Sequence, residues 1–122
     1  MKTILFVEDE QTLQKTLGDA LSKVGYKVIN AMDGETGLKL AQTKMPDLVL
    51  LDIVLPKKEG FEVLAALKED PKTRDIPVII LTNLEKMEDI EKALRLGATT
   101  YLIKTEYALE NVMEKIKKCL GE

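Results

Sequence analysis

The sequence predicts an α/β domain built on a parallel sheet of five strands. Short apolar runs alternate with longer segments of helical period along the whole chain. Turn or breaker residues such as Gly25, Pro46, Pro77 and Gly97 bound the runs, and no repeat or low-complexity tract interrupts the alternation. Strict alternation of strands and helices is typical of parallel sheets, in which right-handed crossovers place helices on both faces.

The composition of the five apolar runs indicates where each strand lies in the sheet. The first, third and fourth runs are apolar at every position, as strands covered on both faces should be. The second and fifth contain polar residues, which edge strands tolerate. This arrangement fits a flavodoxin-like fold, a three-layer (βα)5 sandwich with strand order 2-1-3-4-5. The predicted strands are residues 4–7, 27–31, 48–51, 78–81 and 100–103.

Helical periodicity marks the segments between the strands. Gly25, Pro71 and Gly97 stop the first, third and fourth helices. Asp33 caps the second helix, where Gly37 costs about 1 kcal/mol relative to alanine. In each predicted helix the periodic apolar residues, Met87 and Met113 among them, are expected to face the core. From the first helix to the fifth they are Leu13, Leu17, Ala20, Leu21 and Val24; Leu38, Leu40 and Ala41; Phe61, Leu64 and Leu67; Met87, Ile90, Ala93 and Leu94; and Leu109, Val112, Met113, Ile116 and Leu120.

Composition excludes several classes of function. The chain has 122 residues, which fits one domain, and its net charge of −3 argues against a nucleic-acid partner. It has no histidine, so neither histidine-based catalysis nor a histidine metal site is possible. Its single cysteine, Cys119, favours a reducing compartment. The first apolar run is too short for a signal peptide or a membrane span, so we expect a cytoplasmic protein with no membrane partner.

Polar residues that suit phosphoryl chemistry stand where the predicted strands end. Glu8 and Asp9 follow the first strand and Asp52 follows the third, while Thr82 and Lys104 stand at the ends of the fourth and fifth. In an open parallel sheet, ligands bind beyond the carboxyl ends of the strands, where the strand order reverses. We therefore expect three carboxylates, one hydroxyl and one ammonium at a single edge of the sheet.

Three neighbouring carboxylates need a cation between them. Two unit charges about 4 Å apart repel by roughly 4 kcal/mol at an effective dielectric of 20. Mg²⁺ removes this cost and prefers carboxylate and phosphate oxygens, so we predict Asp9 and Asp52 as direct ligands and Glu8 as a direct or water-mediated one. A phosphoryl group would then fit the open side, with Asp52 as nucleophile and Lys104 and Thr82 stabilising the phosphoryl oxygens.

Four motifs follow one another in a specific order: Glu8-Asp9, residues 52–60, Leu81-Thr82 and residues 97–104. Together they resemble the receiver domain of two-component response regulators, from residue 2 to about residue 120. The resemblance implies a phosphorelay switch that takes a phosphoryl group from a sensor histidine kinase or a phosphotransfer protein onto Asp52. It implies a single-domain regulator of the chemotaxis or sporulation type over residues 1–122, with no output domain. Such a protein is not an enzyme beyond its own phosphotransfer and slow autodephosphorylation.

The resemblance also implies a role for each site residue. Asp9, Asp52 and the backbone carbonyl of Val54 would hold Mg²⁺, and Glu8 would support the metal. Lys104 would pair with the phosphoryl group on Asp52.

Two further residues would form the switch. Thr82 would move towards the phosphoryl group, and Tyr101 would turn into the space that Thr82 leaves. The face formed by the fourth helix, the fifth strand and the fifth helix would then change its preference for a downstream protein target. We expect a monomer or a phosphorylation-dependent homodimer.

Three positions depart from the family pattern. Thr105 follows Lys104 where the family usually has a proline after a cis peptide bond. Because a cis bond before another residue costs about 2.5–4 kcal/mol, we predict a trans bond and a shifted loop. Asn83 replaces a small residue beside the site and would change the lifetime of the phosphoryl group. Glu59 is a weaker N-cap than the more usual aspartate or asparagine.

The sequence leaves other functions to be weighed. The first is a pseudo-receiver, a binding module of the same fold that docks a partner without phosphorylation, which Thr105 and Asn83 favour. The second is an aspartyl-phosphate phosphohydrolase, which needs a second acid where this chain has Val54 and a cap domain for which 122 residues leave no room. A flavin carrier is weaker still, because Glu8, Asp9 and Glu10 would repel a phosphate after the first strand.

Overall fold

The computed structural model describes all 122 residues and contains one parallel sheet of five strands, in the order β2-β1-β3-β4-β5. This order confirms the predicted flavodoxin-like architecture, and the predicted strand limits are correct to within one residue. The strands are β1 (Thr3–Val7), β2 (Lys27–Ala31), β3 (Leu48–Leu51), β4 (Val78–Thr82) and β5 (Thr100–Ile103). The helices are α1 (Gln11–Lys23), α2 (Gly34–Lys44), α3 (Gly60–Glu69), α4 (Met87–Arg95), the short 3₁₀ helix η1 (Lys104–Glu106) and α5 (Leu109–Cys119).

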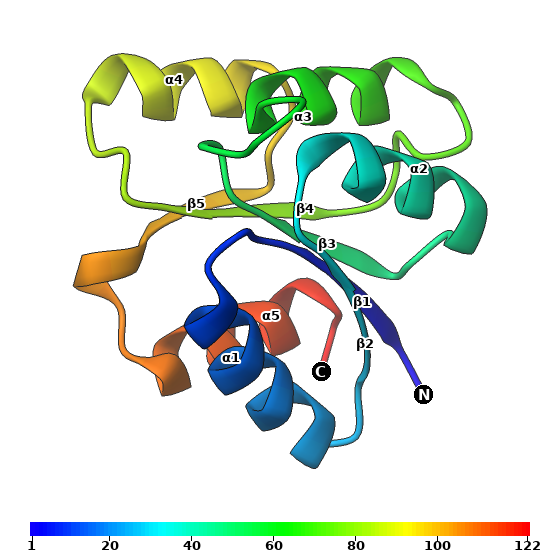
Figure 1. Cartoon of the computed structure of the whole chain (residues 1–122), viewed down its shortest axis with the longest axis vertical. Helices are drawn as coiled ribbons and strands as arrows, with labels where there is room; N and C mark the ends of the chain where they lie inside the picture. Colours follow the sequence, from blue (N-terminus) through cyan, green and yellow to red (C-terminus); the bar gives the residue numbers. More distant parts are fainter.

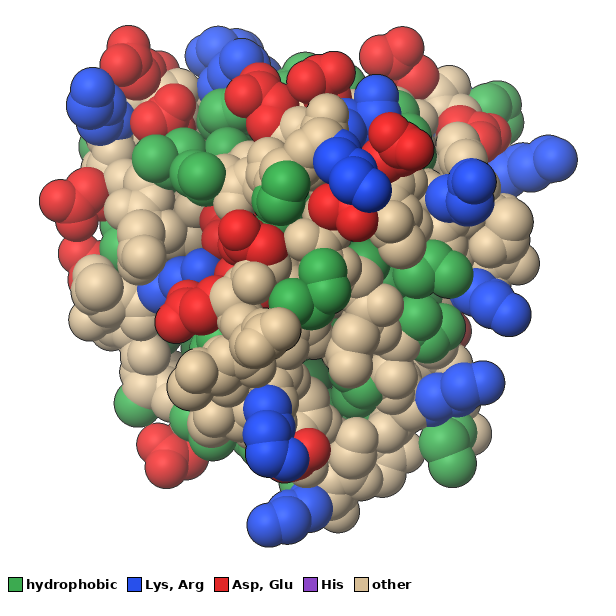
Figure 2. All heavy atoms as spheres, in the orientation of Figure 1, with side chains coloured by type: hydrophobic (Ala, Val, Ile, Leu, Met, Phe, Trp, Pro, Cys, Tyr) green, Lys and Arg blue, Asp and Glu red, His purple; other side chains and the backbone are tan.

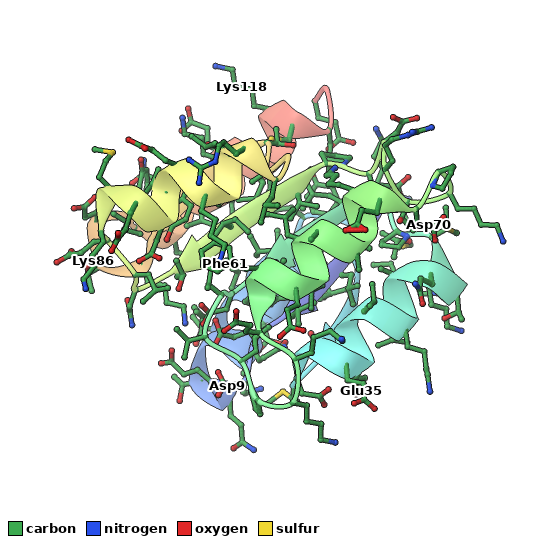
Figure 3. The ribbon with its side chains drawn as sticks, turned by 90° about the horizontal axis from the view of Figure 1, so that it is seen from above. Asp9, Glu35, Phe61, Asp70, Lys86 and Lys118 are labelled. Carbon is green, nitrogen blue, oxygen red and sulfur yellow. The ribbon has the colours of Figure 1, made fainter.

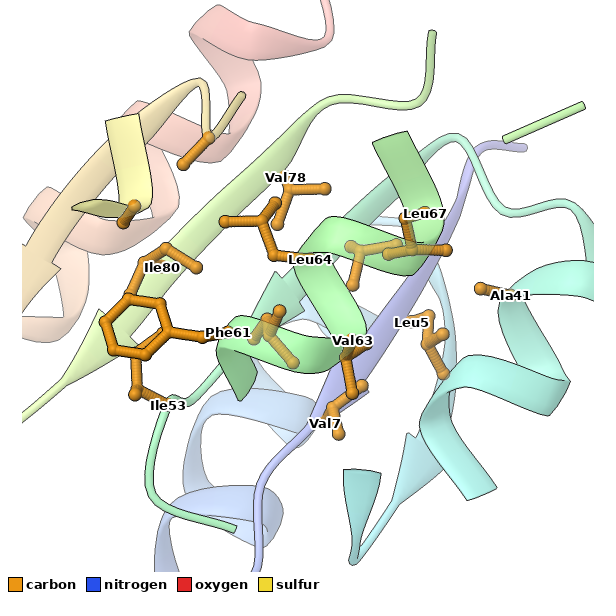
Figure 4. Close-up of a cluster of buried hydrophobic side chains, with 14 of the residues drawn as sticks. Leu5, Val7, Ala41, Ile53, Phe61, Val63, Leu64, Leu67, Val78 and Ile80 are labelled. Carbon is orange, nitrogen blue, oxygen red and sulfur yellow. The ribbon is translucent and has the colours of Figure 1, made fainter. Parts of the chain in front are cut away.

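The helices cover both faces of the sheet, as Figure 1 shows: α2, α3 and α4 lie on one face, and α1 and α5 lie on the other. Alternate residues of the strands point to opposite faces. Leu5, Val49 and Ile80 belong to the core under α2, α3 and α4, which Figure 4 shows in close-up. Ile4 and Leu48 belong to the core under α1 and α5. Burial on both faces explains why β1, β3 and β4 are almost entirely apolar.

Two glycines allow helices to approach the strands that carry the site. A Cβ at Gly37 would lie 2.7 Å from a methyl of Val7, so the glycine that weakens α2 is what lets it lie against β1. A Cβ at Gly60 would lie 2.3 Å from the backbone oxygen of Asp52. The first residue of α3 therefore rests directly on the backbone that carries Asp52.

The predicted core face of α4 is wrong in two places. Met87 and Leu94 are 66% and 48% exposed, and Ala93 is the only buried residue of the helix. Periodicity identified an apolar stripe on α4, but the stripe is buried only at Ala93. Val24, also expected to face the core, is 47% exposed at the C-terminal end of α1. Met113 and Cys119 are half-buried and pack against the core under α1 and α5.

The remaining local predictions concern the loops. All peptide bonds are trans, including the bond from Lys104 to Thr105, and η1 follows β5 directly. The Glu59 side chain makes no capping hydrogen bond to α3, as expected of a weak N-cap.

No helix is long and apolar enough to cross a membrane. Figure 2 shows acidic and basic side chains interspersed over one face of the molecule, without a continuous region of either charge. This mixture accords with the small net charge of −3.

Candidate metal centre at the carboxyl ends of the strands

A cleft of about 320 Å³ lies at the carboxyl ends of β1, β3, β4 and β5. Six of the seven predicted site residues line it, and Tyr101 does not. Sequence reasoning assigned no site role to Glu10, and it treated Asn83 only as a departure from the family pattern. The eight lining residues are Glu8, Asp9, Glu10, Asp52, Val54, Thr82, Asn83 and Lys104.

The pairing of β1 with β3 brings the acidic residues together. Val7 is in register with Leu51, so the residues that follow them, Glu8 and Asp52, leave the sheet side by side. The Asp52 N–H donates to the Val7 carbonyl at 3.0 Å and continues the ladder by one bond. The Glu8 N–H donates to the Ala31 carbonyl at 2.9 Å. Backbone hydrogen bonds therefore fix both carboxylates relative to the sheet.

The Asp52 carboxylate is buried and accepts hydrogen bonds at both oxygens. Its Oδ1 accepts from the N–H groups of Ile53 at 2.7 Å and Val54 at 3.3 Å. Its Oδ2 accepts from Lys104 Nζ at 2.9 Å. These donors hold the carboxylate in one orientation, with its charge compensated by one ammonium and two amides.

Lys104 forms ion pairs with the carboxylates that follow β1 and β3. Its Nζ lies 2.8 Å from Glu8 Oε1, 2.9 Å from Asp52 Oδ2 and 3.6 Å from Glu10 Oε1. Burial alone would lower the pKa of Lys104, but hydrogen bonds to Asp52 and Glu8 outweigh it and raise the pKa above its ordinary value. The ammonium therefore stays charged at neutral pH.

Glu8 is fully buried, in contrast to its neighbour Asp9. Its Oε2 accepts from the Glu10 N–H at 3.0 Å. Burial raises the pKa of Glu8 to about 7, and the nearby Asp52 charge adds to this effect, while Lys104 and the Glu10 N–H oppose it. A buried carboxylate of this kind favours a nearby cation.

The donor set fits a hard divalent cation. One carboxylate oxygen from each of Glu8, Asp9 and Asp52 lies within 4.8 Å of the other two. Figure 3 shows Asp9 at the end of the sheet where α3 begins. Three oxygen ligands that leave space for water suit Mg²⁺ better than a softer metal. The Val54 side chain is 60% exposed at the same cleft.

Thr82 and Tyr101 each form a hydrogen bond with the backbone of Leu84. Thr82 is fully buried at the end of β4, and its Oγ1 accepts from the Leu84 N–H at 3.5 Å. Tyr101 is half-buried on β5, and its hydroxyl donates to the Leu84 carbonyl at 2.9 Å. Burial raises the pKa of Tyr101 to about 12, so the hydroxyl remains a donor at neutral pH. One residue of the loop before α4 thus connects the two predicted switch residues.

The sequence analysis missed the buried side-chain amide of Gln14, which holds α1 against the strand ends beside the cleft. The two N–H groups of Gln14 Nε2 are shared among three carbonyls, those of Phe6 and Glu8 at 3.0 Å and of Ala31 at 3.1 Å, which ties α1 to the ends of β1 and β2. Its spacing of three residues from Leu17 marked the inner face of α1. No local pattern marked Glu10 as a partner of Lys104, because that contact depends on the fold.

Comparisons with known proteins agree on one family. The chain matches the family described as "Response regulator receiver domain" over residues 4–117. It is 42% identical over 101 residues to the "Probable transcriptional regulator ycf27" of Guillardia theta, covering 83% of this chain and 39% of that protein. The chain spans between 39% and 49% of the length of three curated relatives that it matches.

Solved structures show the same fold. The response regulator receiver domain protein (CheY-like) from Methanospirillum hungatei JF-1 has a TM-score of 0.92 and 29% identity, over 99% of this chain and 94% of that one. The receiver domain of sensor histidine kinase PA1611 from Pseudomonas aeruginosa PAO1 has a TM-score of 0.89 and 26% identity, over 99% and 98%. That structure is described with a magnesium ion coordinated in its active site cleft.

Proposed function

The chain belongs to the response regulator receiver family, and from that premise we propose that it is a switch controlled by phosphorylation of Asp52 in the presence of Mg²⁺. Receiver domains are signalling domains rather than classical enzymes. The observation that carries the proposal is the buried Asp52 carboxylate, which shares Lys104 with Glu8 and lies within 4.8 Å of two other carboxylates. We propose that the whole chain, residues 1–122, is one receiver domain.

In the proposed reaction an Asp52 oxygen attacks the phosphorus of the donor. A bond forms between that oxygen and phosphorus, and the bond from phosphorus to the donor nitrogen or oxygen breaks. The leaving group departs with its electron pair and takes a proton from solvent where its basicity requires one. Mg²⁺ would neutralise charge on the phosphoryl oxygens, held by Asp9, Asp52 and the Val54 carbonyl, with Glu8 in support.

The other residues of the cleft would stabilise the product. Lys104 would donate one of its N–H groups to a phosphoryl oxygen. The Thr82 hydroxyl, whose only hydrogen bond in this structure is the 3.5 Å contact with the Leu84 N–H, would donate to another. Movement of Thr82 would disturb Leu84, and with it the hydrogen bond from Tyr101 to the Leu84 carbonyl. This route would link phosphorylation to α4 and β5.

Receiver domains in general interact with histidine kinases and downstream targets. For this chain we propose that a histidine kinase or phosphotransfer protein supplies the phosphoryl group and that a protein target binds the face of α4, β5 and α5. The exposed Met87 and Leu94 of α4 support this face, because they give it apolar contact area.

Intact-mass spectrometry tests the proposal. Incubation with Mg²⁺ and acetyl phosphate should add one phosphoryl group, and either EDTA or Asp52→Ala should abolish the adduct. Asp47→Ala, an exposed aspartate at the opposite end of β3, is the matched control and should leave the adduct intact. A wild-type chain that forms no adduct with any phosphodonor would contradict the proposal and favour the pseudo-receiver alternative.

A further inference from the structure

Oxygens of three different carboxylates lie close to the Lys104 ammonium. An ammonium has three N–H donors. Its neighbours are Glu8 Oε1 at 2.8 Å, Asp52 Oδ2 at 2.9 Å and Glu10 Oε1 at 3.6 Å. Only the first two oxygens lie within hydrogen-bond distance, so a phosphoryl oxygen would bind the remaining N–H, on which Glu10 has the weakest claim, or displace one of the two.

Glu10 is the neighbour that yields most readily. The side chains of Glu8 and Asp52 are 1% and 5% exposed, whereas that of Glu10 is 57% exposed. The Glu10 contact is also the longest of the three and exceeds ordinary hydrogen-bond length. A carboxylate that already contacts water loses little when it leaves an ion pair.

Glu10 nevertheless stays at the cleft after it releases Lys104. Its backbone N–H donates to Glu8 Oε2 at 3.0 Å, which fixes the start of its side chain at the cleft wall. Four carboxylates line this cleft beside one ammonium, so with all four ionised one net negative charge remains even when a divalent cation is bound. Charges at the rim of a site change association rates and their dependence on salt more than they change stability.

We propose that Glu10 determines donor specificity by disfavouring phosphodonors in proportion to their negative charge. Its negative charge stands beside Lys104 at the cleft and repels the approaching anion. Dianionic acyl phosphates are therefore poorer donors than phosphoramidate, whose protonated nitrogen makes it a monoanion at neutral pH. This inference rests on the proposed function of Asp52.

The test compares two small donors of different charge. Rate constants for adduct formation are measured by intact mass with dianionic acetyl phosphate and with monoanionic phosphoramidate, in Mg²⁺, over a range of ionic strength. Glu10→Gln should raise the rate constant about fivefold for acetyl phosphate and about twofold for phosphoramidate, and high salt should reduce both gains. Glu69→Gln, an exposed site on α3 outside the cleft, is the charge-matched control and should change neither.

The outcomes separate this inference from the proposed function. Equal changes for both donors, no change for either, or a gain that persists at high salt would overturn the role of Glu10 while leaving Asp52 as acceptor. No adduct on the wild-type chain with either donor would overturn the proposed function and this inference with it.

Discussion

The helices α3 and α4, which follow β3 and β4 at the cleft, differ greatly in how many residues they bury. α3 follows Asp52 and buries five residues, and it begins at Gly60 against the Asp52 backbone. α4 follows Thr82 and buries only Ala93. Helices with few buried apolar contacts open locally at lower free energy. One side of the cleft is therefore held more firmly than the other, a difference that suits the proposed switch.

Few specific contacts attach α4 and the loop before it to the rest of the domain. Lys92 lies 4.4 Å from the centre of the Phe61 ring, and the Tyr101 hydroxyl bonds to the Leu84 carbonyl. A cation over an aromatic ring at an exposed site contributes about 0.5–1 kcal/mol. Such contacts hold α4 in place but are weak enough to be exchanged.

The largest predicted difference is between matched leucines of the two helices. Leu64→Ala in α3 should lower the free energy of unfolding by about 3–4 kcal/mol, because Leu64 is fully buried. Leu94→Ala in α4 should change it by less than about 0.5 kcal/mol, because Leu94 is 48% exposed. Urea denaturation of both variants measures the two values. Similar losses would show that α4 is packed as firmly as α3.

The first residues of the helices provide a second pair. Gly60→Ala should cost about 3 kcal/mol, because its Cβ would meet backbone atoms of Asp52 and Ile53. Met87→Ala should be nearly neutral, because Met87 is 66% exposed. Thermal unfolding of the two variants provides the comparison. A neutral Gly60→Ala would mean that the start of α3 does not fix the Asp52 backbone.

Magnesium should stabilise one side of the cleft more than the other. At a hundredfold excess over its dissociation constant, Mg²⁺ should raise the free energy of unfolding by about 2.7 kcal/mol. Hydrogen exchange should slow in β1 and in the loop before α3 and stay unchanged in α4. Asp9→Asn should weaken the binding of Mg²⁺, since it removes a predicted ligand. Equal protection of both helices would contradict the difference between them.

The smallest predicted effect concerns Tyr101. Tyr101→Phe removes the hydrogen bond to Leu84 and should cost about 1 kcal/mol, because it leaves the Leu84 carbonyl without that donor. Hydrogen exchange in α4 should become faster, whereas exchange in α3 should not change. The same change in both helices would place Tyr101 in the general packing of the domain rather than in a link to α4.

The sequence predicted the sheet better than the surfaces of the helices. Central strands buried on both faces leave an unmistakable apolar run, so β1, β3 and β4 were correctly placed in the sheet. The outward position of Met87 could not be predicted, because periodicity detects an apolar stripe but does not say which neighbour covers it. The same limit applies to Gly37. The sequence predicted that this glycine destabilises α2, but it could not predict that the glycine lies against Val7.

The candidate site was predictable because strand ends converge in any parallel sheet. That rule placed Glu8, Asp52 and Lys104 together without knowledge of side-chain geometry. The contact between Glu10 and Lys104 depends on how two long side chains meet, and no spacing rule encodes it. The roles of these residues in phosphoryl transfer remain predictions for the experiments above.

Borohydride reduction of the phosphorylated protein identifies whether Asp52 is the residue that accepts the phosphoryl group. An aspartyl phosphate is reduced to homoserine, so peptide mass spectrometry identifies the residue that carried the phosphoryl group. We expect homoserine at position 52, only after treatment with both Mg²⁺ and a phosphodonor. Reduction at Asp9 or at a glutamate of the cleft, or at no residue of a chain that has gained a phosphoryl group, would contradict it.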